Sequence, residues 1–271
     1  SNNFICEIAK FRGSRMRTIF HQLRSTFLQL FPTQKLRLIF VILVLIAAFV
    51  SVSELAVAKL FTSIILKEDS MDKSTLILLV VLFFIFFALT RTGQFFQRIY
   101  RLRVFDKAFQ VSDEELSYSK ENWRWSLAIE LSTVLSTLTQ MGAVMVLFIY
   151  FNPIFALFNA VVVLVTIAIL GRLFEKQIEA QRGFVQARKL KNPVANSIRV
   201  STRIKMGEFG ILIAGISMIV LLGALLYFNY VGEIEAGNVV VLFLGLRMQN
   251  SNLSGISTGL MRFARARTHS E

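Results

Sequence analysis

Cysteine, proline and charged side chains are scarce in this sequence. The single cysteine, Cys6, has no partner for a disulfide within the chain, which excludes a disulfide-stabilised scaffold. Three prolines and 14 glycines in 271 residues exclude a collagen-like or low-complexity chain. Charged residues make up 17% and hydrophobic residues 55%, whereas a water-soluble domain has about 25% and about 45–50%. The chain is too apolar for water and too long for one membrane anchor.

Six apolar segments are each long enough to cross a bilayer, which takes about 20 helical residues. Few glycines or prolines interrupt them. We therefore expect an all-α membrane protein with six transmembrane helices in one domain, residues 37–267, followed by the start of a linker at 268–271. The expected spans are residues 37–65, 74–97, 131–151, 153–170, 209–230 and 237–263.

The segment before the first span, residues 1–36, is basic and amphipathic. It lacks the apolar core of about 7–15 residues that marks a cleavable signal peptide. Apolar side chains at helical spacing are typical of a helix that lies in the membrane interface. We expect a cytoplasmic elbow region here. Its expected lipid-facing residues are Ile19, Phe20, Leu23, Phe27 and Leu30.

Lysine and arginine gather on one side of the expected bundle. All but four of the 30 lie in 1–37, 91–130, 171–208 and 262–271, at the inner ends of the spans. Basic segments of membrane proteins stay in the cytoplasm. We expect an integral protein of the bacterial inner membrane with both termini in the cytoplasm.

The two inner connections, 91–130 and 171–208, are long and rich in residues that favour helix. We expect the second span to continue as one helix well beyond the membrane, and the sixth to run to about residue 267, a length of about 45 Å. The outer connections are short, with Asn152 and Pro153 joining spans three and four. Helices that extend only on the inner side predict cytoplasmic stalks that bind a soluble partner.

Three stretches together resemble the membrane domain of type I ABC exporters. QLFPTQKLRLIFVILVLIAAFVSVSELAVAKLF (29–61) resembles the elbow helix and first span, and FNPIFALFNAVVVLVTI (151–167) the outer turn and fourth span. The last span is similar in its Gly232 and Gly237 spacing and in the Ala-Arg-x-x-Ser-Glu tail at 266–271. The resemblance implies that the tail leads into a nucleotide-binding domain.

Two departures from that family bear on the expectation. No Gly-x-x-x-x-Gly-Lys-Ser/Thr motif occurs, so this sequence has no P-loop to bind nucleotide phosphates. The inner connections are also shorter than those of the family, and 195–203 reads like the junction of two distant family segments. We therefore expect that cytoplasmic pieces, including an ATPase domain, are missing from the sequence.

The first span contains two charged residues, Glu54 and Lys59. A charge at the bilayer centre costs about 2.5–3.5 kcal/mol, so it normally faces a cavity or a partner. Five residues apart, the two side chains point about 140° from each other and do not pair. Two interpretations stay open. Both residues line a polar cavity, or Lys59 reaches to an interface while Glu54 makes a structural hydrogen bond.

Polar residues also recur at helical spacing in three other spans. The polar residues of the second span form a cationic face, which either meets an anionic head group or is a solvated stalk surface. The hydroxyl side chains of the third span favour helix packing. The polar residues of the sixth span would be unfavourable in lipid, so we expect them to line a water-filled pathway, with helix–helix contact as the alternative. The candidate substrate-pathway residues are Glu54, Lys59, Arg91, Gln94, Arg98, Gln140, Arg247, Asn250, Ser251 and Ser254.

No catalytic constellation is evident. His21 and His269 lie near opposite ends of the chain without a cysteine at ligand spacing, so we expect no metal site. No embedded His–Asp pair is available to activate a serine, so we expect no catalytic residue. The basic residues lack interleaved aromatics on one surface, so we expect no nucleic-acid partner.

Two functional hypotheses follow. The first is the membrane subunit of an ATP-driven exporter or flippase, which moves an amphipathic or lipid-linked substrate from the cytoplasmic side by alternating access. The resemblance implies a second copy or a paralogous half-transporter, membrane lipid, and a nucleotide-binding domain that holds ATP and Mg²⁺, with no cofactor in this chain. The second is a stand-alone protein without an ATPase, either a proton-coupled peptide carrier that uses Glu54 or an assembly or immunity subunit.

Overall fold

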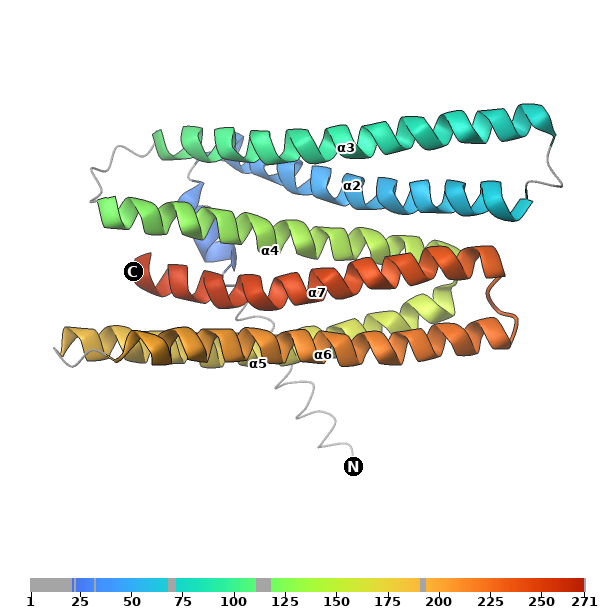
Figure 1. The fold of residues 1–271 in the computed structure, drawn as a ribbon. Helices are drawn as coiled ribbons and strands as arrows, with labels where there is room; N and C mark the ends of the chain where they lie inside the picture. Colours follow the sequence, from blue (N-terminus) through green and yellow to red (C-terminus); the bar gives the residue numbers. More distant parts are fainter. Residues whose placement is uncertain are drawn as a thin grey trace.

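The computed structural model describes residues 21, 23–31, 33–67, 72–110, 118–190 and 194–270, and these form helices without strands. Residues 23–30 are helical and precede six long helices (Figure 1). The long helices are α2 (Gln34–Lys67), α3 (Lys73–Gln110), α4 (Tyr118–Phe151), α5 (Pro153–Lys189), α6 (Asn196–Tyr230) and α7 (Ala236–Ser270).

Each expected apolar segment lies within a separate helix, and the inner connections are helical over most of their length. The continuation of the second span is confirmed, because α3 runs to Gln110. The helical course expected for the last apolar segment is confirmed as well, since α7 runs to Ser270. The helices that contain the third and fifth expected spans begin well before those spans, α4 at Tyr118 and α6 at Asn196.

The turn between α4 and α5 is a single residue, Asn152. Its side chain caps α5 by accepting a hydrogen bond from the Phe155 amide at 2.8 Å, and Pro153 occupies the first turn. The Asn152 Nδ2 also donates to the Glu233 carbonyl in the turn between α6 and α7, at 3.2 Å. Asn152 therefore joins the α4–α5 turn to the α6–α7 turn.

Five helices, α2 to α6, are long and apolar enough to cross a membrane, which indicates an integral membrane protein. The sixth expected apolar segment forms α7, which is not among these five helices of the described residues. The reason is composition, because the expected span in α7 holds more polar residues than any of the other five expected spans. A membrane-crossing course for α7 is therefore a proposal.

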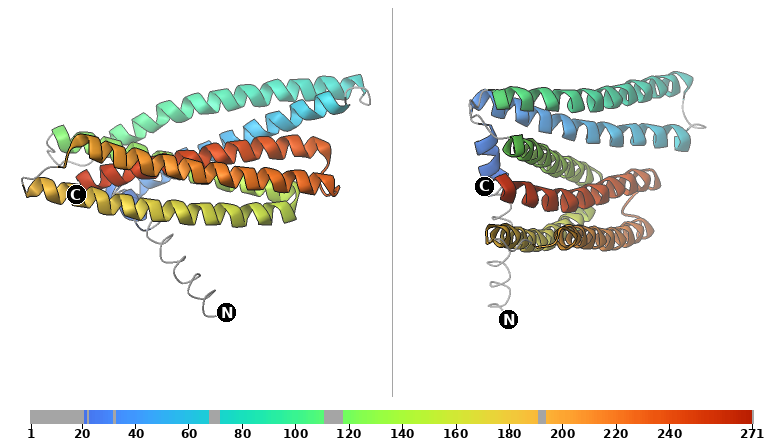
Figure 2. Two further views of the ribbon diagram at one scale, coloured as in Figure 1. Left: turned by 60° about the horizontal axis from the view of Figure 1, so that its bottom comes forward. Right: turned by 60° about the vertical axis from the view of Figure 1, so that its left-hand side comes forward.

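The helices form three layers, with α4 and α7 in the middle (Figures 1 and 2). The α2–α3 pair covers one side of this middle layer and the α5–α6 pair covers the other. α7 contacts α2, α4, α5 and α6, whereas α3 packs mainly on α2. The least apolar long helix thus lies inside the bundle, and the apolar α3 lies outside.

Glycines bring α7 close to its neighbours. Gly245 of α7 lies against Phe148 of α4, where an added Cβ would come within 2.5 Å of the ring. Gly210 of α6 lies against Ser257 of α7, and the Ser257 hydroxyl donates to the Gly207 carbonyl at 3.0 Å. Small residues let helix backbones approach, which is a common basis of helix association in membranes.

The amphipathic segment before α2 differs from the expectation. Leu23 and Leu30 are buried in the main core and do not face lipid. They pack with an aromatic group in which the Phe31 and Phe40 rings are 4.8 Å apart. The burial of Leu23 and Leu30 differs from the expectation because an amphipathic pattern identifies an apolar face but not the surface that covers it. The rest of the elbow region, 1–20 with 22 and 32, lies outside the described residues.

Replacing Gly210 by alanine is expected to destabilise the bundle. The new Cβ would overlap the Ser257 hydroxyl and lie 2.8 Å from Cδ2 of Leu170, and overpacking of this kind costs about 1–3 kcal/mol. Gly215→Ala is the matched control, because it lies on the same helix and faces open space. Thermal unfolding in detergent should give a lower midpoint for G210A only. Equal midpoints would contradict close packing of α6 on α7.

Candidate functional site

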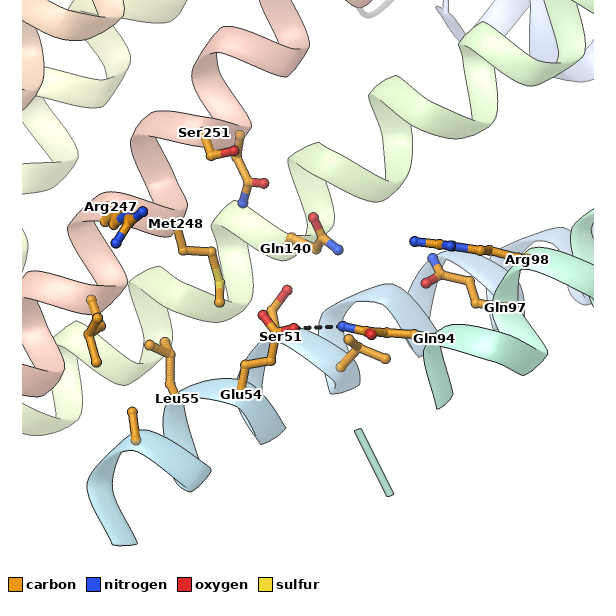
Figure 3. Close-up of a pocket in the computed structure, with 14 residues that line it drawn as sticks. Ser51, Glu54, Leu55, Gln94, Gln97, Arg98, Gln140, Arg247, Met248 and Ser251 are labelled. Carbon is orange, nitrogen blue, oxygen red and sulfur yellow. Dashed lines mark hydrogen bonds between the residues drawn. The ribbon is translucent and has the colours of Figure 1, made fainter. Parts of the chain in front are cut away.

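A cavity of about 560 Å³ lies between α2, α3, α4 and α7 (Figure 3). Its lining is mixed, with polar side chains from all four helices and apolar ones from α2 and α7. Six of the ten candidate pathway residues are brought together here. They are Glu54 of α2, Gln94 and Arg98 of α3, Gln140 of α4, and Arg247 and Ser251 of α7.

The Glu54 carboxylate is tied to α3 through an amide. Gln94 Nε2 donates to Glu54 Oε1 at 2.6 Å, and the Gln94 carbonyl oxygen accepts from Arg91 at 3.1 Å. This chain connects a carboxylate in the cavity to a cation on the exposed surface of α3. It holds α2 and α3 together at the level of the cavity without a direct ion pair.

The cavity carries an excess of positive charge. Arg98 extends from α3 toward Gln140, and Arg247 enters the wall from α7 on the other side (Figure 3). Glu54 is the one acidic residue among the residues that line this cavity. Two guanidinium groups and one carboxylate, surrounded by amides and hydroxyls, can bind an anionic group by charge-assisted hydrogen bonds.

Four candidate residues lie outside the cavity. Lys59 donates to the Asn238 side chain of α7 and lies 5.6 Å from the centre of the Phe151 ring. Arg91 is exposed, 5.3 Å from the Phe87 ring. Asn250 and Ser254 belong to α7 but are not part of the cavity wall. As the spacing predicts, Glu54 and Lys59 each contact another helix and not each other.

Geometry along α7 explains why the polar stripe divides. Asn250 is rotated by about 100° from Ser251, which turns it away from the cavity. Ser254 lies almost a full turn beyond Ser251, past the end of the cavity, and its carbonyl accepts from Thr258 at 3.3 Å. The polar residues of α7 therefore divide between the cavity wall and positions outside it, although they follow one helical spacing.

Sequence reasoning missed three polar residues of the wall. Ser51 and Gln97 each lie three residues from a recognised position, Glu54 or Gln94, and so share its helix face. That spacing is the signal that could have found them. Asn252 also lines the cavity, and its Nδ2 is buried without a hydrogen-bond partner.

A buried amide pair behind the cavity was also missed. Asn159 of α5 and Gln249 of α7 exchange two hydrogen bonds, at 3.0 and 2.8 Å, and both side chains are almost fully buried. Asn159 gives little signal in the sequence, because a lone polar residue in an apolar run does not reveal its partner. The pair fixes α7 against α5 on the side opposite the cavity.

No group of three or more His, Cys, Asp or Glu side chains gathers at metal-binding distance within the described residues. Comparison with models of known protein families finds none that matches the chain, and comparison with curated proteins finds no match either. The cavity, the helix arrangement and the resemblance seen in the sequence are therefore the features that bear on function.

Replacing Asn159 by alanine should destabilise the bundle, because it leaves the Gln249 amide buried without a partner, at a cost of about 1–3 kcal/mol. Replacing both residues by leucine should recover much of the loss. Asn229→Ala, an exposed amide on α6, is the control. Denaturant unfolding in detergent measures all three, and equal stability of N159A and N229A would contradict the structural role.

Proposed function

We propose that this chain is the membrane-spanning subunit of an ATP-driven exporter or flippase. In this proposal it moves an amphipathic or lipid-linked substrate from the cytoplasmic side by alternating access. The observation that carries the proposal is the cavity, in which polar and charged side chains are grouped among helices with apolar outer faces. A polar wall of this size inside an apolar bundle is unfavourable unless water or a polar ligand occupies it.

The chemistry of the wall points to the substrate class. Arg98 and Arg247 provide donors for an anionic head group, while Leu55, Leu244 and Met248 provide apolar contact for the rest of the molecule. Long unbroken helices such as α3 connect this wall to the inner end of the bundle. Movement at the inner end is thereby transmitted to the cavity as a rigid-body shift.

The ATP-dependent part of the proposal is supported by the resemblance to type I ABC exporters. In that arrangement ATP and Mg²⁺ bind to an associated nucleotide-binding domain that docks at the α3–α4 and α5–α6 connections. A second copy or a paralogous half-transporter completes the pathway, and α7 crosses the membrane as the sixth span. The distribution of lysine and arginine supports an inner-membrane location with both termini in the cytoplasm.

One observation favours a second candidate, a proton-coupled carrier. Glu54 faces the cavity and accepts a hydrogen bond from Gln94, so protonation of this carboxylate would change the charge of the wall. A carrier of this kind needs an embedded carboxylate that gains and loses a proton as the cavity changes access. The two candidates differ in what drives the change of access.

Labelling of a cysteine at Ser251 tests whether the cavity is open to water. In a chain with Cys6→Ser, a membrane-impermeant maleimide should modify S251C, because the reactive thiolate forms where water is present. Ile219→Cys is the matched control, since Ile219 is 72% exposed on the outer face of α6 and should react only with an apolar maleimide. If S251C reacts only with the apolar reagent, the transport proposal fails.

The same S251C label separates the two energy sources. In inverted membrane vesicles, ATP with vanadate should reduce labelling several-fold if a nucleotide-binding domain drives the cavity. Collapse of the proton gradient should change labelling instead if the protein is a proton-coupled carrier, and Glu54→Gln should remove that response. An ATP response that persists in E54Q supports the exporter. A gradient response that E54Q abolishes overturns the ATP-driven proposal.

A further inference from the structure

Three arginines from two helices converge at the inner end of the bundle. Arg199 and Arg203 of α6 and Arg265 of α7 line one small pocket together with Gln181 of α5 and Asn196. The pocket has a volume of about 20 Å³, which admits one or two oxygens of a ligand while the rest stays outside. Its lining contains no acidic residue.

The positive charge of this cluster is poorly compensated. Burial lowers the pKa of Arg265, and repulsion from Arg203 and Arg199 lowers it further. The Glu130 carboxylate interacts with the charge of Arg203, but its ion pair, at 3.4 Å, is with Arg262. Three half-buried guanidinium groups without an acid between them form a site that an anion would stabilise.

Two buried glutamines of α5 lie at this cluster. Gln181 is 3% exposed and lines the pocket. One turn earlier on α5, Gln177 is fully buried and both its amide atoms are unpaired. Buried polar groups are nearly always hydrogen-bonded, so an unpaired amide one turn from a cationic pocket indicates a polar ligand.

The groups around this pocket present hydrogen-bond donors and positive potential, which suit the oxygen atoms of an anion. The Arg265 guanidinium lies 5.3 Å from the centre of the Trp123 ring, and stacking on an aromatic face leaves its edge donors free. Arg199 and Arg203 are four residues apart and share one face of α6. The first turn of α6 has no acidic residue and no side-chain cap, so its amide N–H groups add positive potential.

We propose that Arg199, Arg203, Arg265 and Gln181 form a binding site for a phosphate group at the inner end of α5, α6 and α7. The guanidinium groups donate to the phosphate oxygens, and the Gln181 amide nitrogen donates to the innermost one. The phosphate comes either from an anionic lipid head group or from a soluble phosphate compound. The site is separate from the cavity and does not depend on the transport proposal.

Two arms of one experiment distinguish the sources. In the first, native mass spectrometry of the detergent-purified chain measures binding of phosphatidylglycerol, with phosphatidylcholine as the zwitterionic comparison. In the second, tryptophan fluorescence measures titration with inorganic phosphate, since Trp123 lies next to Arg265. Binding in the first arm alone assigns a lipid head group, and saturable binding in the second assigns a soluble phosphate.

The variants test the site itself. Arg199→Gln and Arg203→Gln should each weaken phosphate or phosphatidylglycerol binding about tenfold, because each removes a charge-assisted hydrogen bond. Gln181→Leu should weaken binding several-fold with no change of charge. Lys205→Gln is the matched control, as Lys205 is an exposed cation on α6 outside the pocket, and its affinity should stay within twofold of the parent chain.

Two results would overturn the proposal. One is binding that R199Q, R203Q and K205Q reduce equally while Q181L has no effect, which would show a response to net charge alone. The other is no saturable binding in either arm. Circular dichroism of each variant confirms that the helices are intact, so a loss of binding reports on the site and not on folding.

Discussion

The structure depends on keeping the polar side chains of α7 away from lipid. α7 carries Arg247, Gln249 and Asn252 and is contacted by four other long helices, whereas the apolar α3 lies on the outside. In a bilayer, a polar side chain that faces hydrocarbon costs more than any single packing contact returns. The order of layers follows from this constraint. The apolar α3 can lie outside with α2 as its main neighbour, whereas α7 must contact helices on several sides.

The same constraint produces the cavity and the rigid contacts around it. Behind α7, Asn159 and Gln249 satisfy each other's buried amides, and the glycine contacts at Gly210 and Gly245 bring neighbouring helices close to α7. In front of α7, toward α2 and α3, packing is looser, and Arg247 faces other polar groups across open space. α7 is thus fixed on one side and open on the other, which is a suitable arrangement for a wall that binds ligand.

The sequence predicts the helices well because their causes are local. Apolar runs, helix-favouring inner connections and the Asn152 cap all act within a few residues, so the course of α3 and α7 was correctly expected. The Glu54–Gln94 contact and the burial of Leu23 join residues far apart in the chain. Helical periodicity gives the face on which such a residue lies but not the surface that meets it. The contact partners of these residues therefore required the structure.

The cavity and the phosphate site share α7, and this has a mechanical consequence. Ser251 and Arg265 are 14 residues apart on one unbroken helix, which places them about 21 Å from each other. Between them the Ser257–Gly207 hydrogen bond fastens α7 to α6, the helix that supplies Arg199 and Arg203. A phosphate bound across α6 and α7 would therefore strengthen the α6–α7 contact, which holds the cavity wall on α7 in place. Displacement of α6 at its inner end would carry α7 with it, since close backbone contact resists sliding between the two helices.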